Sequence, residues 1–206
     1  MQDAAAIEAR SMQIIDGLLG DLPRGKEEKA IIKRMVHATG DPDLAWLADI
    51  HPRAVQAACE VFARGGKIIA DVQMVVAGIA ARAARLGVEV LCAIGEPAVA
   101  REAAAQKQTR AMAAMRHLAR DMTGGMVVIG NAPSALYELG HLVRAGQAAP
   151  AVIVATPVGF VGAADSKDAL PALGVPYITV HGTKGGSPAA AAAVNALCRL
   201  YLDRQK

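Results

Sequence analysis

Five short apolar runs, separated by helix-like patterns, most constrain how this chain can fold. The runs are rich in β-branched residues, which is typical of parallel strands buried on both faces. Because strands and helices alternate, we expect right-handed crossovers and a three-layer, doubly wound α/β domain over residues 1–206. Its mainly parallel sheet has about five strands. The predicted strands are Lys67–Ala70, Val88–Ala93, Met126–Ile129, Ala151–Ala155 and Tyr177–Val180.

The helical segments are also recognisable from their sequence patterns. An N-terminal helical pair, Ser11–Leu19 and Lys26–His37, is interrupted near Pro23. The last helix is predicted to have Ser187 as its N-cap and Pro188 at its first helical position. Glycines that follow several helical patterns are typical of helix ends. Further helices are predicted from His51 to Gly65 and over Gln73–Leu86, Pro97–Met122, Pro133–Ala145 and Ser187–Leu202.

The composition argues against a nucleic-acid partner. Aromatic residues make up only 3% of the 206 residues, too few for a platform on which bases stack. The formal net charge is +3, and the lysines and arginines are scattered rather than clustered. Such a small positive excess could favour an anionic small molecule.

The cysteines and the hydropathy pattern predict a cytoplasmic protein. Cys59, Cys92 and Cys198 are odd in number, far apart and not spaced as metal ligands, so we expect small buried side chains in a reducing compartment and no metal site. The N-terminal residues do not resemble a secretory signal. No apolar stretch is long enough to span a bilayer, so no membrane partner is expected.

Four segments rich in glycine and small residues each follow a predicted strand. In a parallel sheet such segments line the carboxyl edge, where ligands bind. Together they indicate a broad site built from backbone and small side chains, which suits a large, flat ligand. The segments are Asp71–Gly78, Gly130–Ala135, Thr156–Phe160 and Gly182–Ser187.

His37 is the candidate proton donor. It is predicted at the C-terminal end of a helix, just before Gly40 turns the chain. A helix C-terminus favours the imidazolium form, and so would a nearby Asp41. Such a histidine can donate a proton near neutral pH. The alternative, and the commoner case, is a histidine that caps the last carbonyls of its own helix.

Gly182–Ser187 is a candidate anion site. Its backbone N–H groups and the following helix N-terminus could bind an anion, with Lys184 adding a charge. Lys184 precedes the paired glycines, so the segment is not a Walker A loop. The alternative is a tight turn that carries a solvated lysine.

Asn131 and Arg110 each allow two interpretations as well. Asn131 could bind a ligand at the sheet edge, or it could cap the helix that begins near Pro133. Arg110 could hold a carboxylate through two hydrogen bonds, although an ordinary surface arginine is more common. The chain lacks the motifs of serine hydrolases, HExxH zinc proteases and dinucleotide-binding proteins.

Five segments, in order along nearly the whole chain, carry a family resemblance. They are Arg34–Asp41, Asp71–Ile79, Val128–Ala135, Pro157–Val161 and Lys184–Ser187. Together they make the chain resemble the precorrin-8X methylmutases of cobalamin biosynthesis.

The resemblance implies an isomerase that moves a methyl group from C11 to C12 of precorrin-8X and yields hydrogenobyrinic acid. No cofactor is implied, because the shift occurs within the macrocycle. His37 matches the general acid of the family. The resemblance also implies a homodimer with the pocket near the subunit interface. Hand-over of the product to neighbouring pathway enzymes would fit this family. The expected substrate-binding residues are Ser11, Thr109, Arg110, Asn131, Ala132, Pro133, Ser134, Gly159, Phe160, Lys184, Gly185, Gly186 and Ser187.

Two positions depart from the family pattern. Thr183 stands where family members often have arginine, which removes one expected contact to a substrate carboxylate. Asp16 stands where many members have glutamate. Two other functions are kept as alternatives: a corrinoid carrier without catalysis, and an enzyme that binds a phosphorylated metabolite at Lys184. Replacement of His37 would separate enzyme from carrier.

Overall fold

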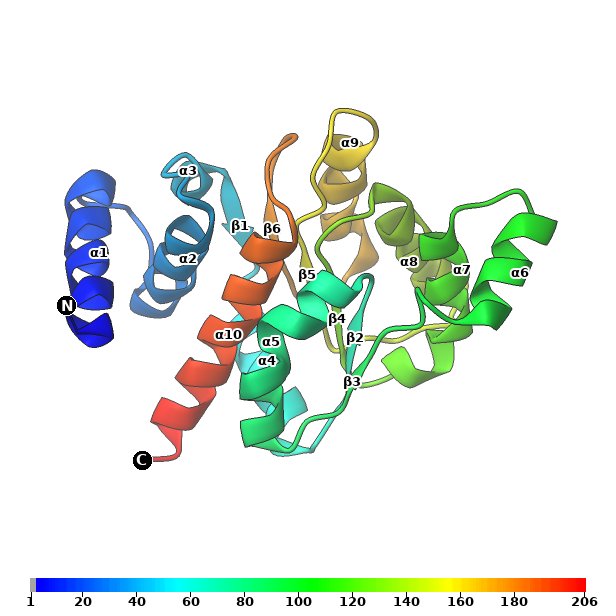
Figure 1. The fold of residues 1–206 in the computed structure, drawn as a ribbon, viewed down its shortest axis with the longest axis horizontal. Coiled ribbons are helices and arrows are strands. Elements are labelled where there is room, and N and C mark those ends of the chain that lie inside the picture. The colour runs from blue at the N-terminus through cyan, green and yellow to red at the C-terminus, as the bar shows by residue number, and fades with distance from the viewer. Residues whose placement is uncertain (1–2) are drawn as a thin grey trace.

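The strands form one six-stranded sheet (Figure 1). The structure is a computed structural model that describes residues 3–206. The strand order is β1-β6-β5-β4-β2-β3. Strands β2 to β6 run parallel, and β1 pairs antiparallel with β6 at one edge. The strands are β1 (Ala48–Ile50), β2 (Ile68–Ala70), β3 (Val90–Leu91), β4 (Met126–Ile129), β5 (Val152–Ala155) and β6 (Tyr177–Val180).

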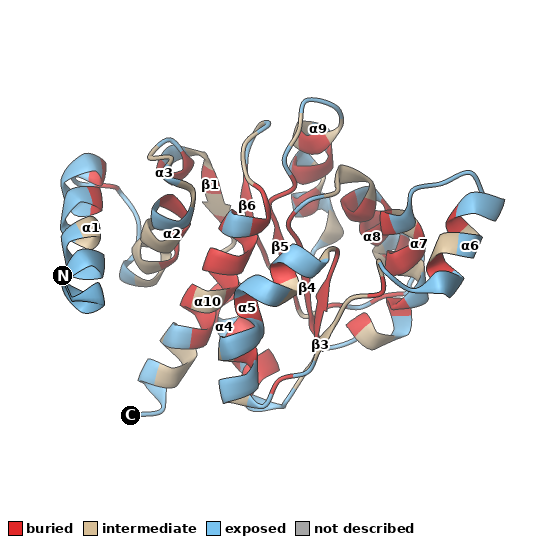
Figure 2. Ribbon diagram, viewed as in Figure 1, coloured by how far each residue is buried: buried red, intermediate tan, exposed pale blue. Residues whose placement is uncertain are grey.

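Helices cover both faces of the sheet, which confirms the three-layer α/β prediction. Successive side chains of a strand point to opposite faces, so Met126 and Val128 of β4 join one core, and Val127 and Ile129 join the other. Figure 2 shows the buried sheet between its two helical layers. No helix among residues 3–206 is long and apolar enough to cross a membrane.

One face is covered by α2, α4, α5 and α10, with α1 beside α2 at the end of the molecule, and the other face by α6, α7 and α8 (Figure 1). The helices are α1 (Ala4–Leu19), α2 (Lys26–Thr39), α3 (Leu44–Leu47), α4 (Ala54–Ala63), α5 (Gln73–Leu86), α6 (Pro97–Ala105), α7 (Arg110–His117), α8 (Pro133–Arg144), α9 (Ala163–Asp168) and α10 (Ser187–Arg204), with 3₁₀ turns η1 (Ala119–Met122) and η2 (Leu170–Leu173).

Strand β1 was not expected from the sequence. It has three residues, and Asp49 at its centre interrupts any apolar run. Asp49 accepts a hydrogen bond from the Tyr177 hydroxyl of the neighbouring strand at 2.9 Å. A polar residue whose side chain is hydrogen-bonded to a neighbouring strand can lie in an edge strand, so a search for apolar runs does not predict β1.

The prediction of one long helix over Pro97–Met122 is wrong. The segment forms α6, α7 and η1, and it breaks where Lys107 adopts a left-handed conformation with φ of 52°. Thr109 then caps α7, its Oγ1 accepting the Met112 N–H at 3.2 Å. Alanine-rich sequence has high helix propensity throughout, which hides such a break. Arg110 is therefore the first residue of α7 rather than a mid-helix residue.

The sheet has a topological switch point between β2 and β4. The chain leaves β2 for β3 on one side, and after β3 it returns past β2 to β4 on the other. In open α/β sheets, ligands bind in the crevice outside the carboxyl ends of the strands at such a point. Asp71 follows β2 and Gly130 follows β4, so two of the glycine-rich segments flank this crevice.

Candidate functional site

The loop between β4 and α8 is held by a buried carboxylate. Asp71 has no exposed surface, and its side chain accepts the N–H groups of Gly130, Asn131 and Ala132, each at 2.9 Å. Burial raises the pKa of the Asp71 carboxyl, while these N–H donors oppose the rise. Because the protein itself uses these three donors, the backbone at this point does not offer them to an anionic ligand.

Asn131 does not cap helix α8. The N-cap is Ala132, and it has no side-chain capping hydrogen bond, so the capping interpretation of Asn131 is wrong and Asn131 is an exposed residue of the loop before the helix. Pro133 begins the helix, where its missing N–H costs nothing. The Ser134 hydroxyl lies 2.9 Å from the Thr109 hydroxyl, which joins the starts of α7 and α8. The structure thus brings Thr109, the exposed Arg110 and Ser134 together.

The loops after β5 and β6 are joined through buried Thr156. The N–H of Gly186 donates to the Thr156 carbonyl at 2.7 Å, and the Thr156 hydroxyl donates to the Gly186 carbonyl at 3.2 Å. The Gly159 N–H donates to the Thr183 carbonyl at 3.1 Å. Gly185 has a φ of 140°, and a Cβ there would lie 2.4 Å from the Thr156 oxygen. Only glycine fits this close approach.

Ser187 is not the N-cap of the last helix. Gly186 takes that position, and Ser187 is the buried first residue of α10. With the helix starting at Ser187, Pro188 still lies in the first turn, where no intrahelical N–H is required. A Cβ on Gly130 would lie 2.8 Å from the Ser187 Cα. The β4 loop and the start of α10 are therefore in direct contact.

Lys184 is paired with two carboxylates. Its Nζ lies 2.9 Å from an oxygen of Asp41 and 2.7 Å from an oxygen of Asp43. Hydrogen bonds to Asp43 and Asp41 raise the pKa of Lys184, and the bond from Lys184 lowers the pKa of Asp41. Asp41 therefore pairs with Lys184 and not with His37, contrary to expectation. The ammonium is already balanced, which weakens the phosphorylated-metabolite interpretation.

His37 lies in the last turn of α2 with an exposed side chain. The capping role is taken by Thr39, whose hydroxyl donates to the Met35 carbonyl at 2.9 Å, while Gly40 ends the helix with a φ of 67°. Within residues 3–206, the His37 side chain has no hydrogen bond or ion pair, so its imidazole is available. It lines a pocket of about 210 Å³, together with Arg34, Ala38, Gly78, Pro188, Ala191, Ala192 and Asn195.

The remaining predicted residues lie further away. Ser11 is one turn after Glu8, which accepts a hydrogen bond from Arg34 of the His37 helix. Figure 1 shows α1 and α7 at opposite ends of the molecule, so one chain does not bring Ser11 and Thr109 into one pocket. In the loop after β5, Phe160 is 94% exposed.

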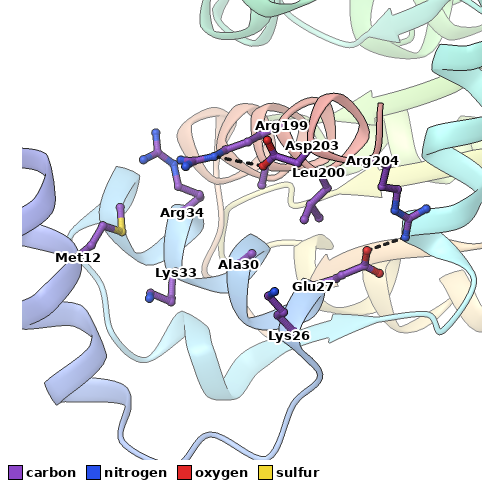
Figure 3. Close-up of a pocket in the computed structure, with 11 residues that line it drawn as sticks. Met12, Lys26, Glu27, Ala30, Lys33, Arg34, Arg199, Leu200, Asp203 and Arg204 are labelled. Carbon is purple, nitrogen blue, oxygen red and sulfur yellow. Dashed lines mark hydrogen bonds and ion pairs between the residues drawn. The ribbon is translucent and has the colours of Figure 1, made fainter. Parts of the chain in front are cut away.

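A separate cavity of about 490 Å³ lies between α1, α2 and α10 (Figure 3). It contains none of the predicted site residues, and it shares only Arg34 with the His37 pocket. Its cations are largely paired, Arg204 with Glu27 and Arg199 with Asp203. We therefore place the candidate site at the carboxyl edge of the sheet.

Comparisons with known proteins identify the family of this chain. A family model described as precorrin-8X methylmutase matches residues 6–200. The chain belongs to this family. It is similar to a cobalt-precorrin-8 methylmutase of Priestia megaterium, with 40% identity over 93% of this chain and 85% of the relative. A precorrin-8X methylmutase of a Sinorhizobium species is 40% identical over 97% of this chain and 96% of the relative.

The methylmutase fold is shared as well. A solved structure of precorrin-8x methyl mutase from Thermus thermophilus matches with a TM-score of 0.89 and 35% identity, over 98% of both chains. A second solved structure, of a precorrin-8X methylmutase related protein, matches with a TM-score of 0.82 and 31% identity.

Sequence reasoning missed three side chains that shape the loops of this candidate site. Asp71 was part of a recognised segment, and its place directly after a buried strand was the available signal. Thr156 occupies the equivalent place after β5. Lys167 on α9 is fully buried, and its Nζ donates to the Lys184 carbonyl at 2.8 Å. Nothing in the local sequence distinguishes Lys167 from a surface lysine.

Proposed function

We propose that this protein moves a methyl group from C11 to C12 of a corrinoid ring in cobalamin biosynthesis, with His37 as the general acid. Membership of the methylmutase family supports the reaction class. The observation that carries the residue assignment is the imidazole of His37, which has no partner within residues 3–206 and lines a pocket between α2, α5 and the first turns of α10.

The shift needs no oxidant or reductant. The methyl group leaves C11 with its bonding electrons as its bond to C12 forms, and the double bonds of the ring rearrange. A proton from His37 on the conjugated system would make the migrating centre more electron-demanding and so lower the barrier. We propose that peripheral carboxylates of the ring bind to Asn131, which is exposed, and to the N–H of Gly185, which has no acceptor within residues 3–206.

We also propose that the working unit is a homodimer whose pocket is completed at the interface. The His37 pocket of about 210 Å³ is smaller than the ~300 Å³ at the lower end of ordinary ligand sites. Ser11 and Thr109 come from opposite ends of the chain, and Phe160 and Val161 are 94% and 88% exposed. A partner subunit would bring the two ends together and cover this apolar loop. Light scattering after gel filtration tests this, and an active monomer would contradict it.

The decisive test mixes the purified protein with hydrogenobyrinic acid and records the visible spectrum after gel filtration. Co-eluting pigment is expected. Turnover is then compared between wild type, His37→Ala and His141→Ala, an exposed histidine on α8 outside the site. His37→Ala should bind pigment and lose at least ~100-fold in rate, since general acid catalysis contributes about 10²–10⁴-fold. The assay uses metal-free and cobalt-containing rings, because the relatives carry names for both.

Each remaining outcome identifies another function. Pigment binding without turnover in the wild type would indicate a corrinoid carrier. A folded protein that stays colourless would contradict any tetrapyrrole function and direct attention to phosphate esters at Lys184. We further propose a cytoplasmic location, which the free cysteines Cys59, Cys92 and Cys198 support.

A further inference from the structure

Lys167 is a buried lysine without an evident structural reason. It has no exposed surface, and within residues 3–206 its Nζ donates one hydrogen bond, to the Lys184 carbonyl at 2.8 Å. An ammonium group has three N–H donors, so most of its hydrogen-bonding capacity is unused by the described chain. Burying such a group opposes folding, and an apolar residue of the same size is often as stable or more stable. Stability therefore does not account for Lys167.

The bond to Lys184 has a geometric consequence for the next residue. The Lys184–Gly185 peptide bond is trans, and a trans peptide group points its C=O and its N–H in opposite directions. Because Lys167 holds the Lys184 carbonyl, the N–H of Gly185 is directed away from Lys167.

The other polar groups of this loop are largely used by the protein. Thr183 accepts from the Gly159 N–H, and Gly186 exchanges two hydrogen bonds with Thr156. Within residues 3–206 the Gly185 N–H has no acceptor. The loop thus presents a fixed backbone donor at the carboxyl edge of the sheet.

We propose that Lys167 is a positioning residue, which aims the Gly185 N–H at a carboxylate of the bound macrocycle by holding the Lys184 carbonyl. The inference rests on the proposed function, which supplies a ligand rich in carboxylates. Hydrogen bonds between N–H groups and carboxylates are charge-assisted and about twice as strong as neutral ones. Lys167 touches neither the ligand nor the reacting atoms.

The first test uses the wild-type protein and amide hydrogen exchange measured by NMR. Gly185 should exchange rapidly in the free protein, and saturating hydrogenobyrinic acid should slow it at least tenfold. Unchanged exchange in a protein that has bound the pigment would overturn the proposal while leaving the proposed function intact. A wild type that binds no pigment would overturn both.

The second test compares variants of one short helix. Lys167→Met removes the donor and keeps the length of the side chain, so the Kd for hydrogenobyrinic acid and the KM of the reaction should rise about tenfold. The value of kcat should stay within about twofold, because Asp41 and Asp43 still hold the Lys184 side chain near the end of the His37 helix. Lys167→Gln retains an N–H donor and should recover part of the affinity.

Ser166→Ala is the matched control. Ser166 is buried on the same helix, and among the described residues its hydroxyl donates to one partner, the Ala163 carbonyl of that helix. Its Kd and KM should match the wild type. If Ser166→Ala weakens binding as much as Lys167→Met, or if Lys167→Met binds like the wild type, then Lys167 has no positioning role.

Discussion

Two loops at the same edge of the sheet are each held by a buried charged side chain, but in opposite ways. Asp71 accepts three backbone N–H groups of the β4–α8 loop, whereas Lys167 donates to one carbonyl of the β6–α10 loop. The carboxylate uses up the donors of its loop. The ammonium occupies an acceptor and leaves the donor of Gly185 unused.

The sign of a buried charge thus decides what a loop can bind. Backbone N–H groups are the usual anion ligands at the end of a parallel strand. A carboxylate from within the protein occupies that place at the topological switch point, so the backbone N–H groups of the β4–α8 loop are not free to bind an anion, and we expect any contribution of this loop to come from the side chain of Asn131. The β6–α10 loop retains a backbone donor. Anion recognition should therefore centre on Gly185.

Removing the carboxylate should have the largest effect on stability. Asp71→Ala leaves three N–H groups without their acceptor, at about 1–3 kcal/mol for each one that stays dry. We expect a loss of about 3–5 kcal/mol in the free energy of unfolding, measured in urea. Asp71→Asn should lose less, because its amide oxygen can still accept the N–H groups of Asn131 and Ala132 while its NH₂ group would face only the Gly130 N–H.

Asp16→Ala provides the matched control for this prediction. Asp16 is an aspartate on α1 that pairs with Lys33 at the surface. Exposed ion pairs contribute ~1 kcal/mol or less, so the control should change little. Equal losses for Asp71→Ala and Asp16→Ala would mean that the three hydrogen bonds do not hold the loop.

The buried ammonium of Lys167 should make the stability of the protein depend on pH. Burial lowers the pKa of Lys167 from 10.5 to about 8, so the unfolded chain holds more protons between these values. Burial of the charged Lys167 therefore lowers the free energy of unfolding by its full amount below pH 8. This destabilisation is lost, and stability rises, as pH increases from about 8 to 10.5. The rise is at most about 3.5 kcal/mol, because the pKa falls from 10.5 to about 8 and each pKa unit corresponds to ~1.4 kcal/mol.

Other groups also titrate in this range, so the measured quantity is a difference. Urea unfolding of the wild type and of Lys167→Met is followed from pH 7 to 10.5. Lys167→Met should be the more stable protein at pH 7, and its advantage should shrink as pH rises. A constant difference across this range would show that Lys167 is not a buried ammonium.

The fold could be predicted from the sequence where burial alone determines structure. Strands β2, β4, β5 and β6 are buried along their length, and each was recognised as an apolar run. Strand β1 was not predicted because the hydrogen-bond partner of Asp49 is Tyr177, which lies 128 residues away in sequence. The break before α7 was not predicted because it depends on the backbone conformation of Lys107, which an alanine-rich pattern does not indicate.

The candidate site divides in a similar way. The glycine-rich loops and His37 are visible as motifs, since their residue types are unusual at strand and helix ends. Asp71 and Lys167 act through backbone groups of distant loops, the first across 59 to 61 residues. The sequence does not show whether the side chain of an acidic residue or a lysine faces water or a peptide group. Only the packed structure supplies that information.

The smallest expected change in stability comes from replacing Lys184. It tests whether the β6–α10 loop is held mainly by the buried Lys167 or by the partly exposed Lys184. Lys184 holds the loop from outside through Asp41 and Asp43, but all three side chains are partly exposed. Lys184→Met should lower the free energy of unfolding only slightly, because exposed ion pairs contribute little, and the pKa of Asp41, now lowered by Lys184, should rise toward its usual value. NMR titration measures the shift. A loss of stability as large as that of Asp71→Ala would instead make Lys184 the main anchor of the loop and Lys167 a secondary one.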